Sequence, residues 1–187
     1  MHLTNLRHFT VLCARQPAGF QHKSMKAQAR SNRQYAGGKK GERFKLVLVV
    51  AAALLDDQGK VLLAQRPAGK KLAGLWEFPG GKVEDGETPE QALARELKEE
   101  LNIEVELRHL KPLTFASVAY PDQGYTLLMP LYVCWHWSGS PQGLEGQQLS
   151  WVASSELPSY EMPPADLPLV VPVQQAMAAG EPAEVLL

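Results

Sequence analysis

The chain has 187 residues, of which 45% are hydrophobic, and a formal net charge of −1. It is long enough for one domain with a substantial core plus an extension. The near-neutral charge gives no argument for direct binding to nucleic acid or membranes, and no apolar run approaches the roughly 20 residues of a membrane span. The two cysteines, Cys13 and Cys134, are far apart and indicate neither a disulfide framework nor a metal knuckle, which fits a reduced, intracellular compartment.

Residues 1–43 are predicted to be a basic, flexible N-terminal extension. Residues 1–41 hold eight Lys or Arg and no Asp or Glu, which leaves 19 − 8 = 11 basic against 20 acidic residues in the remainder. An acid-free, basic N-terminus resembles an organelle transit peptide, so a mitochondrial or plastid destination is suspected, with a cytoplasmic one otherwise. A plain disordered tail, or a start at Met25, is the alternative. The segment 34–41 has the glycines of a linker before a folded domain predicted at 44–183.

Hydrophobic runs bounded by turn residues predict the strands of this domain. A final helix is expected to follow Met162–Asp166 and to run to about Ala179. Strands combined with two helices indicate an α/β sandwich around a mixed sheet. The predicted strands are 45–55, 61–65, 104–107, 113–120, 126–137 and 150–152.

The helix at 89–101 has the best-marked boundaries in the chain. Thr88 and Gln91 form a capping box, and Pro89 suits the first helical position. Asn102 follows about where the helix should end, and asparagine accepts the left-handed backbone found there. Before this helix, Gly80 and Gly81 are read as part of a glycine-rich loop.

Two faces of this helix differ in character. A core-facing stripe at i, i+4 and i+8 consists of Leu93, Leu97 and Leu101. The neighbouring sector carries Glu96, Glu99 and Glu100. Carboxylates this close repel one another, yet hard divalent cations bind through several such oxygens, and magnesium also binds substrate phosphates. The pattern favours half of a phosphate-bound magnesium site over a merely solvated face once its spacing from the glycines is considered.

That spacing resembles the signature of the Nudix hydrolases. Gly81 is followed after five residues by Glu87 and after seven more by Arg95-Glu96-Leu97-x-Glu99-Glu100, and only the final glycine of the pattern is replaced, by Asn102. The segments 65–66, 75–81 and 162–166 resemble the MutT-type members, the 8-oxo-dGTP diphosphatases. The resemblance covers about residues 46–180. It implies the Nudix fold, an α/β/α sandwich around a mixed β-sheet with a loop–helix–loop catalytic motif.

The resemblance also implies roles for the signature residues. The metal ligands would be the Gly80 carbonyl with Glu96, Glu99 and Glu100, holding Mg²⁺, with Mn²⁺ also possible. Glu87 would orient Arg95, which in turn would brace the carboxylates. Glu96 or Glu99 is predicted to be the general base, and Glu145 matches a further catalytic glutamate on a loop.

The same resemblance places the nucleotide. Residues predicted to bind substrate are Arg66, Glu77, Phe78, Pro79, Gly80 and Asp166. Asp166 replaces an asparagine that reads the oxidised base in MutT proteins, and Lys71 replaces a histidine, so both contacts depart from the family pattern. Lys70, Lys71 and Lys82 are read as solvated side chains, and Phe78 and Trp76 as either stacking or core residues.

The implied activity is hydrolysis of 8-oxo-dGTP to 8-oxo-dGMP and pyrophosphate, which removes an oxidised guanine nucleotide before a polymerase uses it. Hydrolysis of another nucleoside diphosphate derivative is the first alternative. A catalytically silent nucleotide-binding module is the second, although such a module has no need for a like-charged cluster. The oligomeric state is not readable from the sequence.

Overall fold

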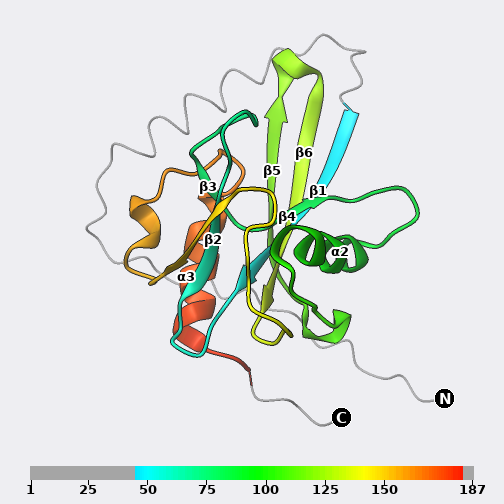
Figure 1. Ribbon diagram of the computed structural model, residues 1–187. Helices are drawn as coiled ribbons and strands as arrows, with labels where there is room; N and C mark the ends of the chain where they lie inside the picture. Colours follow the sequence, from blue (N-terminus) through cyan, green and yellow to red (C-terminus); the bar gives the residue numbers. More distant parts are fainter. Residues whose placement is uncertain (1–44, 183–187) are drawn as a thin grey trace, which may run out of the picture. The chain divides into compact units, whose positions relative to one another are not determined.

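The computed structural model describes residues 45–182 (Figure 1). The predicted extension at 1–43 and its targeting role lie outside these residues. None of the helices in the described part is long and apolar enough to cross a membrane. The helices and strands are β1 (Lys45–Leu54), β2 (Val61–Gln65), β3 (Trp76–Glu77), β4 (Gly80–Lys82), α2 (Pro89–Leu101), β5 (Lys111–Tyr120), β6 (Tyr125–Cys134), β7 (Gln148–Val152) and α3 (Val170–Ala179).

The strands form two sheets. The larger has the order β4-β1-β6-β5, and the smaller has the order β3-β2-β7. In the larger sheet β1 and β6 are parallel, whereas β4 pairs antiparallel with β1 and β5 antiparallel with β6. This is the mixed sheet that the sequence predicts, but the second, antiparallel sheet is an addition to that prediction.

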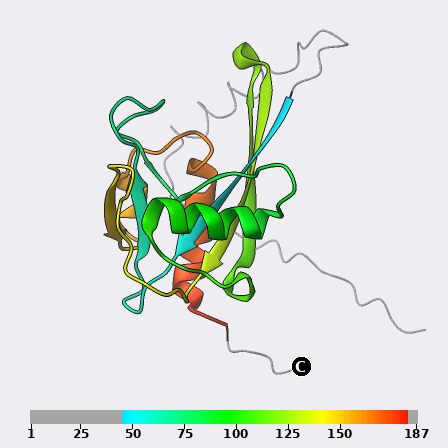
Figure 2. The same cartoon turned by 45° about the vertical axis from the view of Figure 1, so that its right-hand side comes forward.

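The central strand β1 contributes side chains to two hydrophobic cores, because successive side chains of a strand point to opposite faces of the sheet. Val50, Ala52 and Leu54 pack in the cluster that contains the leucines of α2. Ala51 and Ala53 pack in the other cluster, with residues of α3. Figure 2 shows α2 on the near side of these strands and α3 on the far side. The α/β/α arrangement is therefore confirmed.

Helix α2 has the predicted boundaries. The Thr88 side chain accepts from the Gln91 N–H at 3.3 Å, and the Gln91 side chain accepts from the Thr88 N–H at 2.8 Å. Asn102 ends the helix with φ 55° and ψ 32°. The stripe of Leu93, Leu97 and Leu101 is buried, each at 1% exposure or less. The opposite sectors of the helix are thereby turned toward solvent and toward β4.

Three local predictions are wrong. Residues 104–107 do not form a strand: Glu104 makes one isolated bridge to Ser138, and Leu107–His109 is a 3₁₀ turn. β6 ends at Cys134 rather than at Trp137. Gly80–Lys82 is a strand and not a loop, because it pairs with Val49–Ala51 of β1. A strand this short and glycine-rich shows no hydrophobic alternation that would predict it from sequence. It forms because its backbone pairs with β1.

Candidate active site

Two adjacent glycines bring strand β4 against β1 and α2. A Cβ atom on Gly80, whose φ is 152°, would lie 2.1 Å from the Val50 carbonyl oxygen. A Cβ atom on Gly81 would lie 2.1 Å from the carboxylate carbon of Glu96. A side chain at Gly80 would meet the backbone of β1, and one at Gly81 would displace the Glu96 carboxylate, so the two glycines let this carboxylate approach the β4 backbone.

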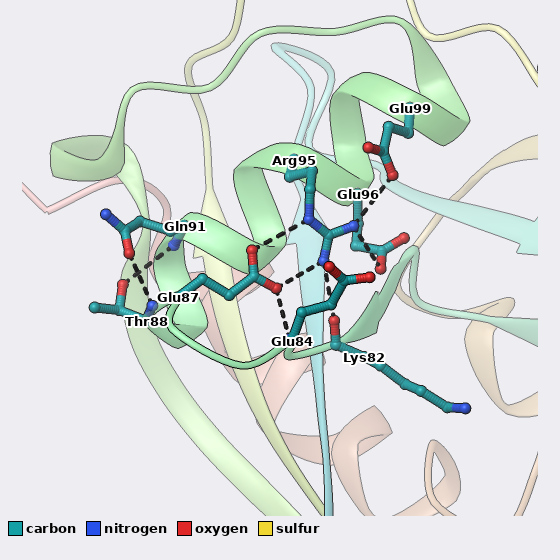
Figure 3. A network of polar contacts seen from close by, with 8 residues as sticks. All are labelled: Lys82, Glu84, Glu87, Thr88, Gln91, Arg95, Glu96 and Glu99. Carbon is teal, nitrogen blue, oxygen red and sulfur yellow. Dashed lines mark hydrogen bonds and ion pairs between the residues drawn. The ribbon is translucent and has the colours of Figure 1, made fainter.

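Arg95 joins the signature carboxylates on α2 to the loop before it (Figure 3). Its Nη2 and Nε donate to the two oxygens of Glu87 at 2.7 and 3.1 Å, and Nη2 also donates to the Lys82 carbonyl at 3.1 Å. Its Nη1 donates to Glu96 and to Glu99, both at 3.1 Å. The predicted pair Glu87–Arg95 is thus in contact, and one guanidinium bridges three carboxylates.

These contacts change the proton affinities of the acids. The Arg95 hydrogen bonds lower the pKa of Glu87, whereas burial raises the pKa of Glu96 despite the same guanidinium. The carboxylates raise the pKa of Arg95 further, so it stays charged. Arg95 therefore offsets part of the repulsion that the glutamate cluster creates.

Glu100 differs from the other two helix carboxylates. Its side chain has no hydrogen-bond or ion-pair partner among residues 45–182, and burial raises its pKa to about 7. Glu145 and then Glu96 add to that rise by charge repulsion. A carboxylate that is partly desolvated and repelled by Glu145, Glu96 and Glu77, with only the Lys70 charge nearby to offset this repulsion, is suited to a cation.

The structure places Glu145 near Glu100 by docking the loop 142–147 on the end of α2. The N–H of Leu144 and the side-chain amide of Gln147 both donate to the Glu100 carbonyl, at 2.9 and 3.0 Å. The Gln147 side chain also accepts from the Glu145 N–H at 2.7 Å. The last carbonyls of a helix have no partner within it, and this loop supplies one.

The predicted metal ligands, the Gly80 carbonyl with Glu96, Glu99 and Glu100, are not gathered around one common position. No group of three or more His, Cys, Asp or Glu side chains within residues 45–182 is already arranged to hold a metal ion. Glu99 is 60% exposed and turned to Arg95, while Glu96 lies against Gly81. Magnesium commonly takes only one or two carboxylates and fills its shell with water and substrate phosphates, so the acidic chemistry of the set still fits such an ion.

A cavity of about 730 Å³ opens beside these residues. Its wall includes the predicted residues Arg66, Glu77, Phe78, Gly80, Glu100, Glu145 and Asp166, and also Lys70, Lys71, Lys82, Gln147 and the apolar Leu127 and Met129. Glu87, Arg95, Glu96, Glu99 and Pro79 are not part of this wall. The Pro79 carbonyl instead accepts from the Ala52 N–H at 2.9 Å.

Asp166 is a charged residue buried in the cavity wall, with 3% exposure. Its Oδ1 accepts from the Phe78 N–H at 3.0 Å. Burial raises its pKa to about 7, and Glu77 adds to that rise. Near neutral pH its carboxyl group can therefore exist either as an acceptor only or as a donor and acceptor together.

Arg66 braces the loop that follows β2. Its Nη1 donates to Glu77 at 2.5 Å, and its Nε donates to the Lys71 carbonyl at 2.7 Å. Burial raises the pKa of Glu77, and the Arg66 charge opposes that rise. Trp76 packs edge-on against Tyr160 and does not line the cavity, while Phe78 both joins the core and lines the cavity.

Sequence reasoning misses two residues of this site. The sequence indicates a solvated Lys70, yet this side chain forms an ion pair with Glu145. Gln147 carries no motif at all and still positions the Glu145 loop. No spacing in the sequence could reveal either residue, because the contacts join segments 75 and 47 positions apart.

Comparison with known proteins agrees with this geometry. The NUDIX domain model matches residues 45–181, and the chain therefore belongs to the Nudix family of hydrolases, enzymes that act on nucleoside triphosphates and generally use divalent metal ions. Among its relatives is the CTP pyrophosphohydrolase of Escherichia coli K12, 40% identical over 138 residues, or 74% of this chain and 98% of that protein. The 8-oxo-dGTP diphosphatase of Haemophilus influenzae is 40% identical over 126 residues, or 67% and 90% of the two chains.

Solved structures give the same result. The solution structure of the Escherichia coli ORF135 protein has a TM-score of 0.64 at 39% identity, covering 79% of this chain and 100% of that one. A MutT structure from a study of Aliivibrio salmonicida and Vibrio cholerae has a TM-score of 0.60 at 36% identity, covering 70% and 98% of the two chains. The predicted Nudix fold and its MutT resemblance are thus confirmed.

Proposed function

We propose that this Nudix hydrolase splits nucleoside triphosphates into a monophosphate and pyrophosphate, and that its main substrate is 8-oxo-dGTP. Removal of this nucleotide would sanitise the precursor pool and prevent mutation during DNA replication. The observation that carries the proposal is a cavity whose wall holds both a buried hydrogen-bonding acid, Asp166, and the signature residues Gly81 and Glu100. Relatives named 8-oxo-dGTP diphosphatase support the choice of substrate.

The phosphate side of the site is proposed to use a divalent cation, Mg²⁺ with Mn²⁺ as a substitute. Glu96, Glu99, Glu100 and the Gly80 carbonyl would hold it, and when bound it would neutralise phosphate charge and lower the pKa of a water molecule. Arg95 holds the carboxylates of Glu96 and Glu99 in place, because its Nη1 donates to both of them.

The chain's own part in the chemistry is proton transfer and positioning. A carboxylate of Glu96 or Glu99, with Glu145 as a further candidate, would accept the proton of the attacking water as general base. The new phosphorus–oxygen bond forms in line with the breaking bond between the α and β phosphates, and pyrophosphate leaves. Burial raises the pKa of Glu96, which strengthens it as a base.

Base recognition is proposed to fall to Asp166. As a carboxylate it can accept the N–H groups of a guanine edge, and as a neutral acid it can also donate to the 6-oxo group. Phe78 holds the Asp166 carboxyl group in place through its backbone N–H. The apolar Leu127 and Met129 in the same wall would contact the base.

A cytosine nucleoside triphosphate is a second candidate, and one observation favours it. The pKa of Asp166, about 7, leaves a large neutral fraction at neutral pH. A neutral carboxyl group matches cytosine, since it donates to N3 and accepts from the N4 amino group. The relative named CTP pyrophosphohydrolase supports this candidate.

Pyrophosphate release by the full chain with Mg²⁺ tests the proposal. We would compare kcat/KM for 8-oxo-dGTP, dGTP, CTP and dCTP. A preference of about 100-fold for 8-oxo-dGTP over dGTP, equivalent to about 3 kcal/mol of transition-state binding, is expected. A larger kcat/KM for CTP would replace the oxidised guanine nucleotide by a cytosine nucleotide, and no release from any of the four would refute the proposal.

We also propose an intracellular location and a small-molecule nucleotide as the binding partner, without direct nucleic acid or membrane contact. The relatives described above are bacterial proteins and lend no support to organelle import. Targeting by residues 1–43, and the domain boundary at residue 44, stay sequence predictions.

A further inference from the structure

Lys70 and Glu145 both line the cavity, and their side chains form an ion pair. The Lys70 ammonium group donates to Glu145 Oε2, and the two side chains are 49% and 45% exposed. Glu145 lies on the loop that is docked on the end of α2, close enough to Glu100 for mutual repulsion. A lysine is therefore the immediate counter-charge of the carboxylates proposed to work on the phosphates.

The backbone around Lys70 is well anchored. The N–H of Arg66 donates to the Leu75 carbonyl and the N–H of Gly74 donates to the Arg66 carbonyl, both at 2.9 Å, which closes the base of the loop. Within the loop, Arg66 Nε donates to the Lys71 carbonyl at 2.7 Å. These contacts hold residue 70 at the cavity wall, so only its flexible side chain has to move.

The other cations of the wall are differently engaged. Arg66 is paired with the partly buried Glu77. Lys71 donates to the neutral amide oxygen of Gln123 at 2.9 Å. The side chain of Lys82 runs away from the α2 carboxylates in Figure 3. Lys70 alone among these four is ion-paired with an acid of the catalytic side.

An ion pair this exposed is weak and exchanges easily, since such pairs contribute at most about 1 kcal/mol. A divalent cation near Glu100 and Glu145 would compete with the ammonium group for the same oxygens. A triphosphate would at the same time bring several negative charges to the cavity, and lysine binds phosphate as a compact point charge.

We infer that Lys70 binds the phosphate chain of the substrate, and that Glu145 holds its ammonium group in place until a divalent cation displaces it. The inference rests on the proposed function, because it assigns a residue to the triphosphate of that substrate. Lys70 then neutralises Glu145 before the cation binds, and it contacts the phosphates of the substrate once the cation has bound.

Binding measurements on Lys70→Met test the inference. The matched control is Lys98→Met, because the Lys98 side chain is also 49% exposed and ion-paired, with Glu104, but does not line the cavity. The probes are Mn²⁺ alone, a nonhydrolysable α,β-methylene nucleoside triphosphate with saturating Mn²⁺, and the corresponding monophosphate. Neither side chain is buried, so both variants should fold, which circular dichroism checks.

Lys70→Met is expected to change the two affinities in opposite directions. The Kd for Mn²⁺ should fall about threefold because a competing charge is gone. The Kd for the triphosphate analogue should rise about tenfold, with little change for the monophosphate. Lys98→Met should leave all three values within about twofold.

Two results overturn the inference while leaving the proposed function intact. One is an unchanged triphosphate affinity in Lys70→Met, and the other is an Mn²⁺ affinity that is unchanged or weaker. A wild-type protein that binds no triphosphate analogue would instead refute the proposed function, and this inference would fall with it.

Discussion

Glu100 and Asp166 are two acids of the cavity wall whose pKa values are raised to about 7 for partly different reasons. Burial is the largest cause for both. Glu100 is in addition repelled by Glu145 and Glu96, whereas Asp166 is nearly inaccessible and held by one backbone N–H. The first environment suits a cation and the second suits a carboxyl group that gains and loses a proton, so the two acids fit the different roles proposed for them.

The variant Glu100→Gln removes the charge and keeps the shape of the side chain. Turnover at saturating Mg²⁺ should fall on the order of a thousandfold, because the cation loses the carboxylate best suited to it. The protein should stay folded, since the repulsion from Glu145 and Glu96 is relieved. Pyrophosphate release measures the effect, and Glu106→Gln, an exposed acid of a neighbouring turn, is the control. Normal turnover in Glu100→Gln would refute the assignment.

The variant Asp166→Asn removes the titrating carboxyl group of Asp166 and keeps a side chain of nearly the same shape. Because the pKa of Asp166 is raised from 3.8 to about 7, the folded protein holds this proton more tightly than the unfolded chain. The free energy of unfolding of the wild type should therefore fall as pH rises through this window and level off above it. Asn does not titrate, so the stability of the variant relative to wild type should increase by about 3 kcal/mol between about pH 5 and about pH 8.

Urea denaturation at both pH values measures this difference. The exposed Asp122→Asn, on the β5–β6 turn, serves as the control and should show a nearly constant difference from wild type. A pH-independent difference for Asp166→Asn would show that the Asp166 carboxyl group is ionised throughout this range.

At the scale of elements, helix α2 and strand β4 can lie close together because Gly81 has no side chain. Gly81 leaves the space that the Glu96 carboxylate fills, and the capping box fixes where α2 begins. The Arg95 guanidinium then ties the helix to the Lys82 carbonyl of β4 at 3.1 Å. The helix, its preceding loop and the strand thus act as one unit in placing the carboxylates.

The variant Gly81→Ala should damage activity more than stability. The new methyl group would overlap the Glu96 carboxylate and displace this end of a flexible side chain from its present position beside Arg95. We expect kcat to fall on the order of a hundredfold, in line with a misplaced catalytic group. Thermal unfolding and pyrophosphate release would be measured together.

A contrasting variant is Gly59→Ala in the turn after β1. Gly59 has φ 72°, and a Cβ atom there would meet no other atom within 4 Å, so the added methyl group strains only the backbone. Its free energy of unfolding should fall by about 1 kcal/mol with kcat unchanged. Equal loss of kcat in both variants would contradict the special role of Gly81.

At the scale of the whole molecule, the site exists only because distant segments meet on one side of the larger sheet. β1 places β4 and α2, while the loop 142–147 reaches α2 through hydrogen bonds to the Glu100 and Leu101 carbonyls. A cation that binds here therefore binds the folded chain and not the unfolded one. Such binding stabilises the fold by mass action.

Mg²⁺ should therefore raise the thermal unfolding midpoint of the wild type. At a concentration about 100 times its Kd the gain is about 2.7 kcal/mol, whereas Glu100→Gln should show almost none of it. Differential scanning fluorimetry at constant ionic strength, adjusted with NaCl, measures the change. An equal rise in both proteins would mean that the cation binds elsewhere.

Much of the site is predictable because its chemistry lies in one continuous stretch. The capping box of Thr88 and Gln91, the leucine stripe and the carboxylates follow helical spacing, which depends only on local geometry. The strands 45–54 and 61–65 are predictable for the same reason, since a short run of apolar residues indicates a buried strand. By contrast, the predicted strand at 104–107 makes only one bridge, because a strand also needs a partner edge, which its own residues do not specify.

The sequence by itself determined the family, helix α2 and the acids that this helix carries, since these depend on residues close together in the chain. Only the tertiary structure decided that Gly80–Lys82 is a strand, that Asp166 is buried against Phe78, and that Glu145 is ion-paired with Lys70 and repels Glu100. The reason is physical: strand pairing, desolvation and charge coupling are set by segments far apart in sequence, and no local pattern encodes which of them will meet.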